Sequence, residues 1–180
     1  MKPSALVMKI RNLAFLAFLF GPLNFIHAQV TDSIIVVIKE KYKHIRDNLQ
    51  SYDTTETAIW DQSSEGGEVI GYFENDSLVL IEITYFGETG KTGLEFYFEK
   101  GQLIFVLDKH YEYNRPITDT VMFDPNKTKI TEDRYYFYQA QLIRWLDNDK
   151  NEVDLTAGTN ALVGMSLIAH ANKIRDQLIK

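Results

Sequence analysis

Apolar residues recur at helical spacing near both ends of the chain. Intervals of three and four residues separate them, and polar residues fill the positions between, so an amphipathic helix is predicted over about residues 31–50 and another over about residues 158–179. The two apolar stripes consist of Ile35, Ile38, Tyr42, Ile45 and Leu49, and of Val163, Leu167, Ala171, Ile174 and Leu178.

The centre of the chain repeats one motif three times. Each copy has two aromatic residues, four turn-region residues, then leucine and a β-branched residue, and the copies occupy residues 72–79, 97–104 and 136–143. This pattern is typical of a β-hairpin, whose central turn positions often need positive φ. Asn75-Asp76 and Lys100-Gly101 suit those positions, whereas Gln139-Ala140 is poorer turn chemistry.

A two-residue turn in the second copy would set the register of its two strands. The predicted cross-strand pairs are Phe98 with Leu103, Phe96 with Phe105, and Leu94 with Leu107. Strand alternation then places all six on one face of the sheet.

These elements together predict an α+β fold. Its centre is an antiparallel β-meander of six to seven strands, with an N-terminal and a C-terminal amphipathic helix. Residues 55–61 are expected to add an edge strand, and residues 114–133 to form a long irregular connection containing Pro116 and Pro125. Packing of both helices on one face is the preferred arrangement, and one helix on each face is the alternative.

The hairpin units over about residues 68–147 locally resemble MORN-type repeats. They also resemble small exported bacterial proteins that carry no assigned activity. The resemblance supports hairpins and implies no catalytic residues, and MORN units contain more glycine than these do.

The first 28 residues have the order of features found in a secretory signal peptide. Lys2, Lys9 and Arg11 precede an apolar run at residues 13–20, and the small Ala28 provides a cleavage point. A membrane anchor is the alternative, but Pro22 and Asn24 interrupt the run before it is long enough to span a bilayer. Cleavage leaves residues 29–180 as a single domain, located in the periplasm or secreted.

Composition narrows the class of partner. The chain has no cysteine, and residues 29–180 contain 16 basic and 25 acidic residues, a formal charge of −9. Such a surface repels nucleic acid and anionic lipid. No nucleic acid partner and no stable membrane anchor are therefore expected.

No motif predicts a cofactor. Residues 87–93 are rich in glycine but lack the spacing of a phosphate loop, and a hairpin turn accounts for them better. Oxygen ligands alternate at residues 147–151, which leaves a weak, irregular calcium site or a polar turn as interpretations. Asp108, His110 and Glu112 share one strand face, but the sequence identifies no further ligand for zinc.

Carboxylates are the candidate catalytic groups, because nucleophilic catalysis has little support in the sequence. The chain lacks a nucleophile elbow, and no base can be assigned to Ser63. Glu82 and Glu95 interrupt apolar strands, and with Asp108 they would be the acid and base of a hydrolase acting on extracellular polymer.

The remaining indication of function is the set of aromatic residues on the predicted strands. Alternation predicts a second apolar sheet face, rimmed by tyrosines and able to recognise a protein, peptide or glycan of the cell envelope. The candidate binding residues are Tyr72, Tyr85, Tyr97, His110, Tyr136 and Trp145. An exported, non-enzymatic binding module is therefore the first hypothesis. The hydrolase and an envelope assembly subunit that pairs with its own copy as a homodimer are the alternatives.

Overall fold

The computed structural model describes residues 21–60, 63 and 65–179, and the chain divides into two compact units, Met1–Val37 and Ile38–Lys180. The division falls within helix α2 (Gly21–Asp47), so the described part of the first unit is the first 17 residues of this helix. Most of the predicted signal peptide lies outside the described residues. Its expected cleavage point at Ala28 falls inside α2.

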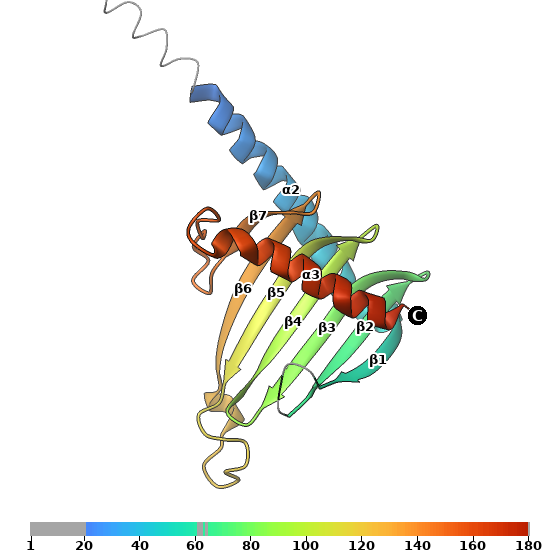
Figure 1. Cartoon of the computed structure of the whole chain (residues 1–180), viewed down its shortest axis with the longest axis vertical. Coiled ribbons are helices and arrows are strands. Elements are labelled where there is room, and N and C mark those ends of the chain that lie inside the picture. Colours follow the sequence, from blue (N-terminus) through green and yellow to red (C-terminus); the bar gives the residue numbers. More distant parts are fainter. Residues whose placement is uncertain (1–20, 61–62, 64, 180) are drawn as a thin grey trace, which may run out of the picture. The chain divides into compact units, whose positions relative to one another are not determined.

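The second unit is built on a seven-stranded antiparallel sheet with the strand order β1-β2-β3-β4-β5-β6-β7 (Figure 1). The strands are β1 (Asp53–Ile59), β2 (Gly67–Glu74), β3 (Ser77–Gly87), β4 (Gly90–Glu99), β5 (Gln102–Glu112), β6 (Lys129–Tyr138) and β7 (Gln141–Leu146). Helix α3 (Asn160–Leu178) follows the sheet, and short 3-10 helices occupy Leu49–Ser51 and Pro125–Lys127. The predicted α+β meander with a helix at each end is confirmed. Neither α2 nor α3, as described, contains a stretch long and apolar enough to cross a membrane.

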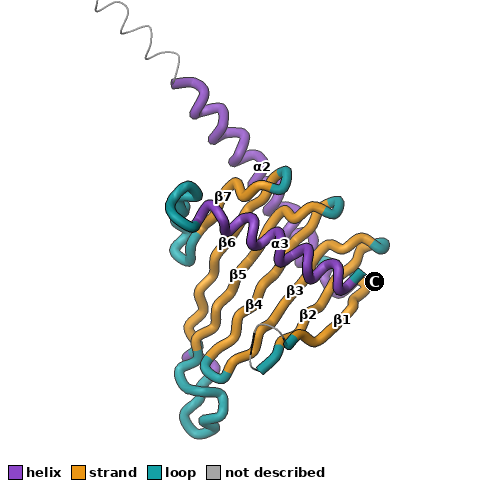
Figure 2. The backbone as a smooth tube through the Cα atoms, viewed as in Figure 1, coloured by secondary structure: helices purple, strands orange, loops and turns teal. Residues whose placement is uncertain are grey.

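All three repeated motifs form hairpins with the same turn. Both central residues have positive φ in each copy, at 47° and 64° for Asn75-Asp76, 51° and 75° for Lys100-Gly101, and 49° and 58° for Gln139-Ala140. This is the type I′ geometry that matches the twist of antiparallel strands. These turns lie at one end of the sheet, and the longer β1–β2 and β5–β6 connections lie at the other (Figure 2).

Each hairpin also carries a β-bulge between its two aromatic residues. The register shifts between Tyr72 and Phe73, between Tyr97 and Phe98, and again in the third copy. The β-branched residue of each motif is the unpaired extra residue, and side-chain alternation changes phase there. The bulge residues are Val79, Ile104 and Ile143.

Part of the predicted register is wrong because of the bulge. Phe98 pairs with Leu103 as expected, but the observed partner of Phe96 is Val106 and that of Leu94 is Asp108. Phe105 and Leu107 therefore point to the opposite face of the sheet.

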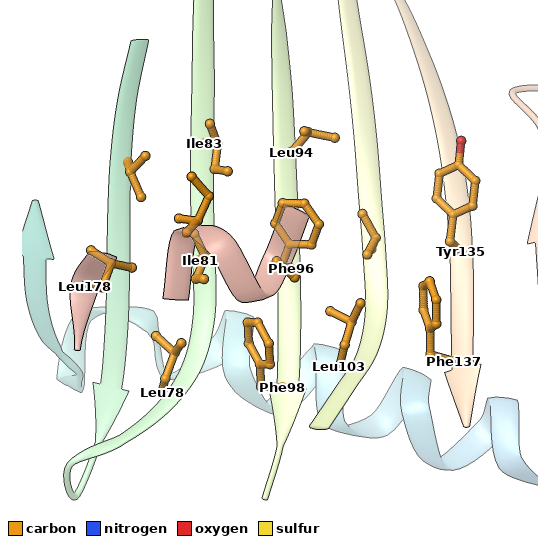
Figure 3. Packing of buried hydrophobic residues seen from close by; sticks show 14 of the residues in the cluster. Leu78, Ile81, Ile83, Leu94, Phe96, Phe98, Leu103, Tyr135, Phe137 and Leu178 are labelled. Carbon is orange, nitrogen blue, oxygen red and sulfur yellow. The ribbon is translucent and has the colours of Figure 1, made fainter. Parts of the chain in front are cut away.

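Helix α3 crosses one face of the sheet, called here the α3 face (Figure 1). Ala171, Ile174 and Leu178 of the helix pack into a cluster of strand residues that includes Phe96. Figure 3 shows Leu178 with the strand residues of this cluster. The helix approaches β7 closely at Gly164, where an added Cβ would lie 2.7 Å from Leu142 Cβ.

The opposite face, called here the aromatic face, bears Tyr72, Tyr97, Phe105 and Tyr136. Residues 38–47 of α2, which belong to the second unit, pack against it through Tyr42. The preferred prediction that both helices share one face is therefore wrong. Helical periodicity specifies which side of a helix is apolar, but it does not specify which sheet face that side meets.

Candidate binding site on the aromatic face

Aromatic rings form a continuous layer between the sheet and residues 38–47. The Tyr42 ring lies edge-on to Tyr97 and Phe105, with centroids 5.0 and 5.4 Å apart. Phe105 in turn lies 5.0 Å from the Tyr136 ring. Tyr97 and Tyr136 are only 0% and 3% exposed, so the open aromatic platform expected from the sequence is covered by the helix.

A cluster of ion pairs also links residues 38–47 of α2 to the aromatic face. Glu82 and Glu95 face each other across β3 and β4. Arg46 of α2 lies with its Nη1 atom 2.5 Å from Glu82 Oε1 and 3.7 Å from Glu95 Oε2. Burial by itself lowers the pKa of Arg46, but Tyr97 and the two carboxylates raise it by more, so the guanidinium stays charged.

The remaining carboxylate oxygens also have partners. Tyr72 donates to Glu82 Oε2 at 2.8 Å, Lys109 Nζ lies 2.8 Å from Glu95 Oε1, and the Tyr97 hydroxyl donates to Glu95. Burial and the adjacent carboxylates raise the pKa of both tyrosines well above the usual range, so both remain proton donors. Two of the carboxylates expected to serve a hydrolase are therefore bound in a structural cluster.

A pocket of about 160 Å³ opens beside this layer, between the helix and strands β5 and β6. Its walls combine aliphatic and aromatic side chains with two cationic ones. The lining residues are Ile38, Lys39, Tyr42, Phe105, Leu107, Arg134 and Tyr136.

Arg134 is the polar group that distinguishes this pocket. Its Nη2 atom bonds Glu132 Oε2 at 2.5 Å. Its Nη1 atom is buried and has no hydrogen-bond partner among the described residues. Burial raises the pKa of Tyr136, and the guanidinium groups of Arg134 and Arg144 oppose that shift. The pocket can thus supply apolar contact and a hydrogen-bond donor with positive charge.

The six residues expected to form one site are divided between the two faces. Tyr72, Tyr97 and Tyr136 lie on the aromatic face, and only Tyr136 lines the pocket. Tyr85, His110 and Trp145 lie on the α3 face. The bulges cause this division, because the prediction continued the alternation through each hairpin without a phase change.

The residues on the α3 face have local partners. The Tyr85 hydroxyl lies 3.0 Å from His170 Nε2 of α3, and the Thr92 hydroxyl lies 3.3 Å from His110 Nδ1. These contacts join strand side chains to each other and to the helix.

A pair of carboxylates also lies on the α3 face. Asp108 of β5 faces Asp133 of β6, whose Oδ2 accepts a hydrogen bond from Trp145 Nε1 at 3.0 Å. The pKa of Asp108 is raised to about 6. Burial is the larger cause and repulsion from Asp133 the smaller one, and His110 opposes the shift.

The remaining ligand predictions fall on local turns and pairs. Residues 87–90 form the β3–β4 hairpin turn, as expected. At residues 147–151, Asp147 Oδ1 accepts the backbone N–H of Asn151 at 2.8 Å. Glu112 pairs with Lys129 at 3.7 Å. Nowhere in residues 21–60, 63 and 65–179 do three or more His, Cys, Asp or Glu side chains gather so as to hold a metal ion.

Sequence reasoning missed Lys39, Phe105 and Arg134 as site residues. Phe105 was assigned to the other face. Arg134 directly follows the irregular connection expected over residues 114–133 and was given no role, and that connection ends earlier because β6 begins at Lys129. The signal that could have located Arg134 is its position two residues before the third repeat, which extends the strand backwards.

We compared the chain with known protein families, curated proteins and solved structures. None of them matches it.

Proposed function

We propose that this chain is an exported, non-enzymatic binding module, periplasmic or secreted, whose site lies on the aromatic face of the sheet. The observation that carries the proposal is the pocket under residues 38–47, in which Tyr42, Phe105 and Tyr136 meet two cations. Concave sites with mostly apolar walls and a few polar groups are typical of ligand binding. The partner is a group about the size of one ring, either a free small molecule or part of an envelope protein, peptide or glycan.

The ion cluster supports a binding role over catalysis at this face. Arg46 and Tyr72 contact the carboxylate of Glu82, and Lys109 and Tyr97 contact that of Glu95. An acid or base must reach the reacting atom of a substrate, and these contacts occupy the oxygens that would do so.

The proposal is tested by titrating the ¹⁵N-labelled full chain with benzyl alcohol, a neutral single-ring probe. Amide shifts at Tyr42, Phe105 and Tyr136 are expected to move together and to saturate. The proposal is overturned if these amides do not respond to benzyl alcohol or to a charged ring compound of the same size.

A pair of phenylalanine substitutions provides the control. Ile38→Phe adds volume inside the pocket and is expected to abolish the response. Val37→Phe adds the same ring at the preceding position, which is 54% exposed, and is expected to leave the response to benzyl alcohol unchanged. The dispersion of each ¹⁵N spectrum shows whether the variant remains folded.

A carboxylate-dependent hydrolase is the second candidate, and the Asp108–Asp133 pair on the α3 face favours it. A carboxyl with a pKa near 6 can donate a proton close to neutral pH. The full chain would then cleave a chromogenic glycoside, and Asp108→Asn would lose that activity. Absence of cleavage across α- and β-linked substrates would eliminate this candidate.

A further inference from the structure

The pocket on the aromatic face is lined by cationic side chains in an acidic protein, and one of them, Arg134, is paired with Glu132. Two of its seven lining residues, Lys39 and Arg134, are cationic and none is acidic, whereas the whole chain has a formal charge of −6. The other five are aliphatic or aromatic. This combination fits a ligand that joins an anionic group to an apolar body.

Arg134 points to the kind of anionic group. Glu132 occupies only one terminal nitrogen of the guanidinium, and the other, Nη1, is buried with no acceptor in the described part of the chain. Buried donors are nearly always hydrogen-bonded in folded proteins. An acceptor supplied by a ligand would satisfy this one.

The volume limits the apolar body. The pocket measures about 160 Å³. A cavity of about 150 Å³ lined by aliphatic and aromatic residues holds one benzene molecule. The space therefore accommodates one six-membered ring or a short alkyl chain.

We infer that this pocket binds a small carboxylate whose body is about one aromatic ring in size, with its carboxylate on Arg134. The inference rests on the proposed function and names the ligand class of the same site. The ring lies among Phe105, Tyr42 and Leu107. Arg134 lines the pocket and its side chain is 24% exposed, so part of the side chain is accessible to a ligand.

Carboxylate suits the pocket better than phosphate does. Each terminal nitrogen of a guanidinium carries two N–H groups, so Nη2 has a second donor besides the one that bonds Glu132. That donor and one from Nη1 match a planar carboxylate with two parallel hydrogen bonds. A phosphate dianion would bring more charge and more acceptor oxygens to apolar walls that offer few donors, and its desolvation would be poorly compensated.

The test compares three probes on the full chain by calorimetry and ¹⁵N NMR. Benzoate is expected to bind at least about tenfold more tightly than benzyl alcohol, which has the same ring without the charge. Inorganic phosphate is expected to cause no saturable change at Tyr42 or Phe105.

Two arginine variants locate the effect. Arg134→Met keeps the length of the side chain and is expected to remove the preference for benzoate. Arg115→Met removes the same charge from an exposed loop position and is expected to retain the preference. If Arg134→Met does not fold, Arg134→Lys provides the second reading, because it keeps the charge but loses the paired hydrogen bonds.

Each outcome is decisive. Equal binding of benzoate and benzyl alcohol would overturn the carboxylate inference and leave the binding proposal standing. Binding of neither probe would overturn both. Phosphate binding that matches benzoate and depends on Arg134 would replace the carboxylate with a simple anion site.

Discussion

Arg46 is the residue that holds two facing carboxylates together. Glu82 and Glu95 are neighbours across β3 and β4, and like charges directly opposite each other destabilise a sheet. The guanidinium lies between them and also ties the C-terminal end of α2 to the sheet. Its contribution is therefore both electrostatic and structural.

Replacing Arg46 with methionine should destabilise the protein. The change leaves Glu95, whose side chain is 11% exposed, with only Lys109 to balance it, and a loss of about 2 kcal/mol in the free energy of unfolding is expected. Urea denaturation measures it. Lys43→Met is the matched control, because it removes an exposed ion pair with Asp47 on the same helix and should cost less than about 0.5 kcal/mol.

Asp108 should make the protein less stable as the pH rises. Its pKa is about 6 in the folded protein and about 3.9 when unfolded, so the folded state binds the proton more tightly. Stability associated with this group is full below pH 4 and is lost as the pH passes 6. Asp108→Asn should remove this dependence and raise the free energy of unfolding at pH 7.5 by about 1 kcal/mol, allowing for partial solvent screening.

The measurement for Asp108 is urea denaturation at pH 4.5, 6 and 7.5. The other titratable groups facing it on the sheet are Asp133 and His110. A control is also needed for the loss of a negative charge from the strand. Glu112→Gln removes an exposed carboxylate from the same strand and should leave the pH profile unchanged. An Asp108→Asn profile that still falls between pH 4.5 and 7.5 would assign the effect to another group.

At the scale of elements, the repeat was the most informative feature of the sequence. Equal spacing between the aromatic pair and the leucine predicted three hairpins, and the structure has them at residues 72–79, 97–104 and 136–143. The bulge was not predictable in the same way. Whether a bulge forms depends on which sheet face the residues around the β-branched position pack against. Tertiary packing decides that, and local sequence does not.

The third hairpin uses residues poorly suited to its turn. Gln139 and Ala140 both adopt positive φ, at 49° and 58°, where side chains with a Cβ are strained. Replacing the pair with Asn-Gly should raise the free energy of unfolding by about 1 kcal/mol. Differential scanning calorimetry would show it as a higher Tm. Gly101→Ala, at φ 75° in the equivalent turn, should lower Tm, and a rise there would contradict the argument.

The candidate site was only partly predictable for the same reason. Tyr136 was identified because the repeat places it beside a turn. Arg134 and Lys39 become neighbours only because residues 38–47 pack on the aromatic face, and no pattern within either segment specifies that packing.

At the scale of the whole molecule, strands β1 and β7 are the two edges of the sheet, and the long edge strand β1 bears on association with another chain. Strand β1 is paired on one side only, with β2, and six of its seven residues are exposed. Asp53 and Glu56 are its charged residues. Charges on an edge strand disfavour pairing with another sheet.

The chain is therefore expected to remain monomeric at high concentration, as sedimentation equilibrium would show. Glu56→Val should promote association, because it removes the charge from the middle of the edge and raises strand propensity. Glu68→Val makes the same change on β2, which pairs with strands on both sides, and is expected not to promote association. A stable dimer of the unaltered chain would instead support the envelope assembly alternative.

The three bulges have a consequence for how such a sheet can change in length. Each hairpin has its own bulge, so the change in side-chain alternation takes place within a single motif. It does not depend on the number of strands elsewhere in the sheet. A two-stranded unit could thus be duplicated or deleted without inverting the side chains of its neighbours. The architecture is open to growth by whole hairpins, whereas the gain or loss of one residue at a bulge would turn half a hairpin inside out.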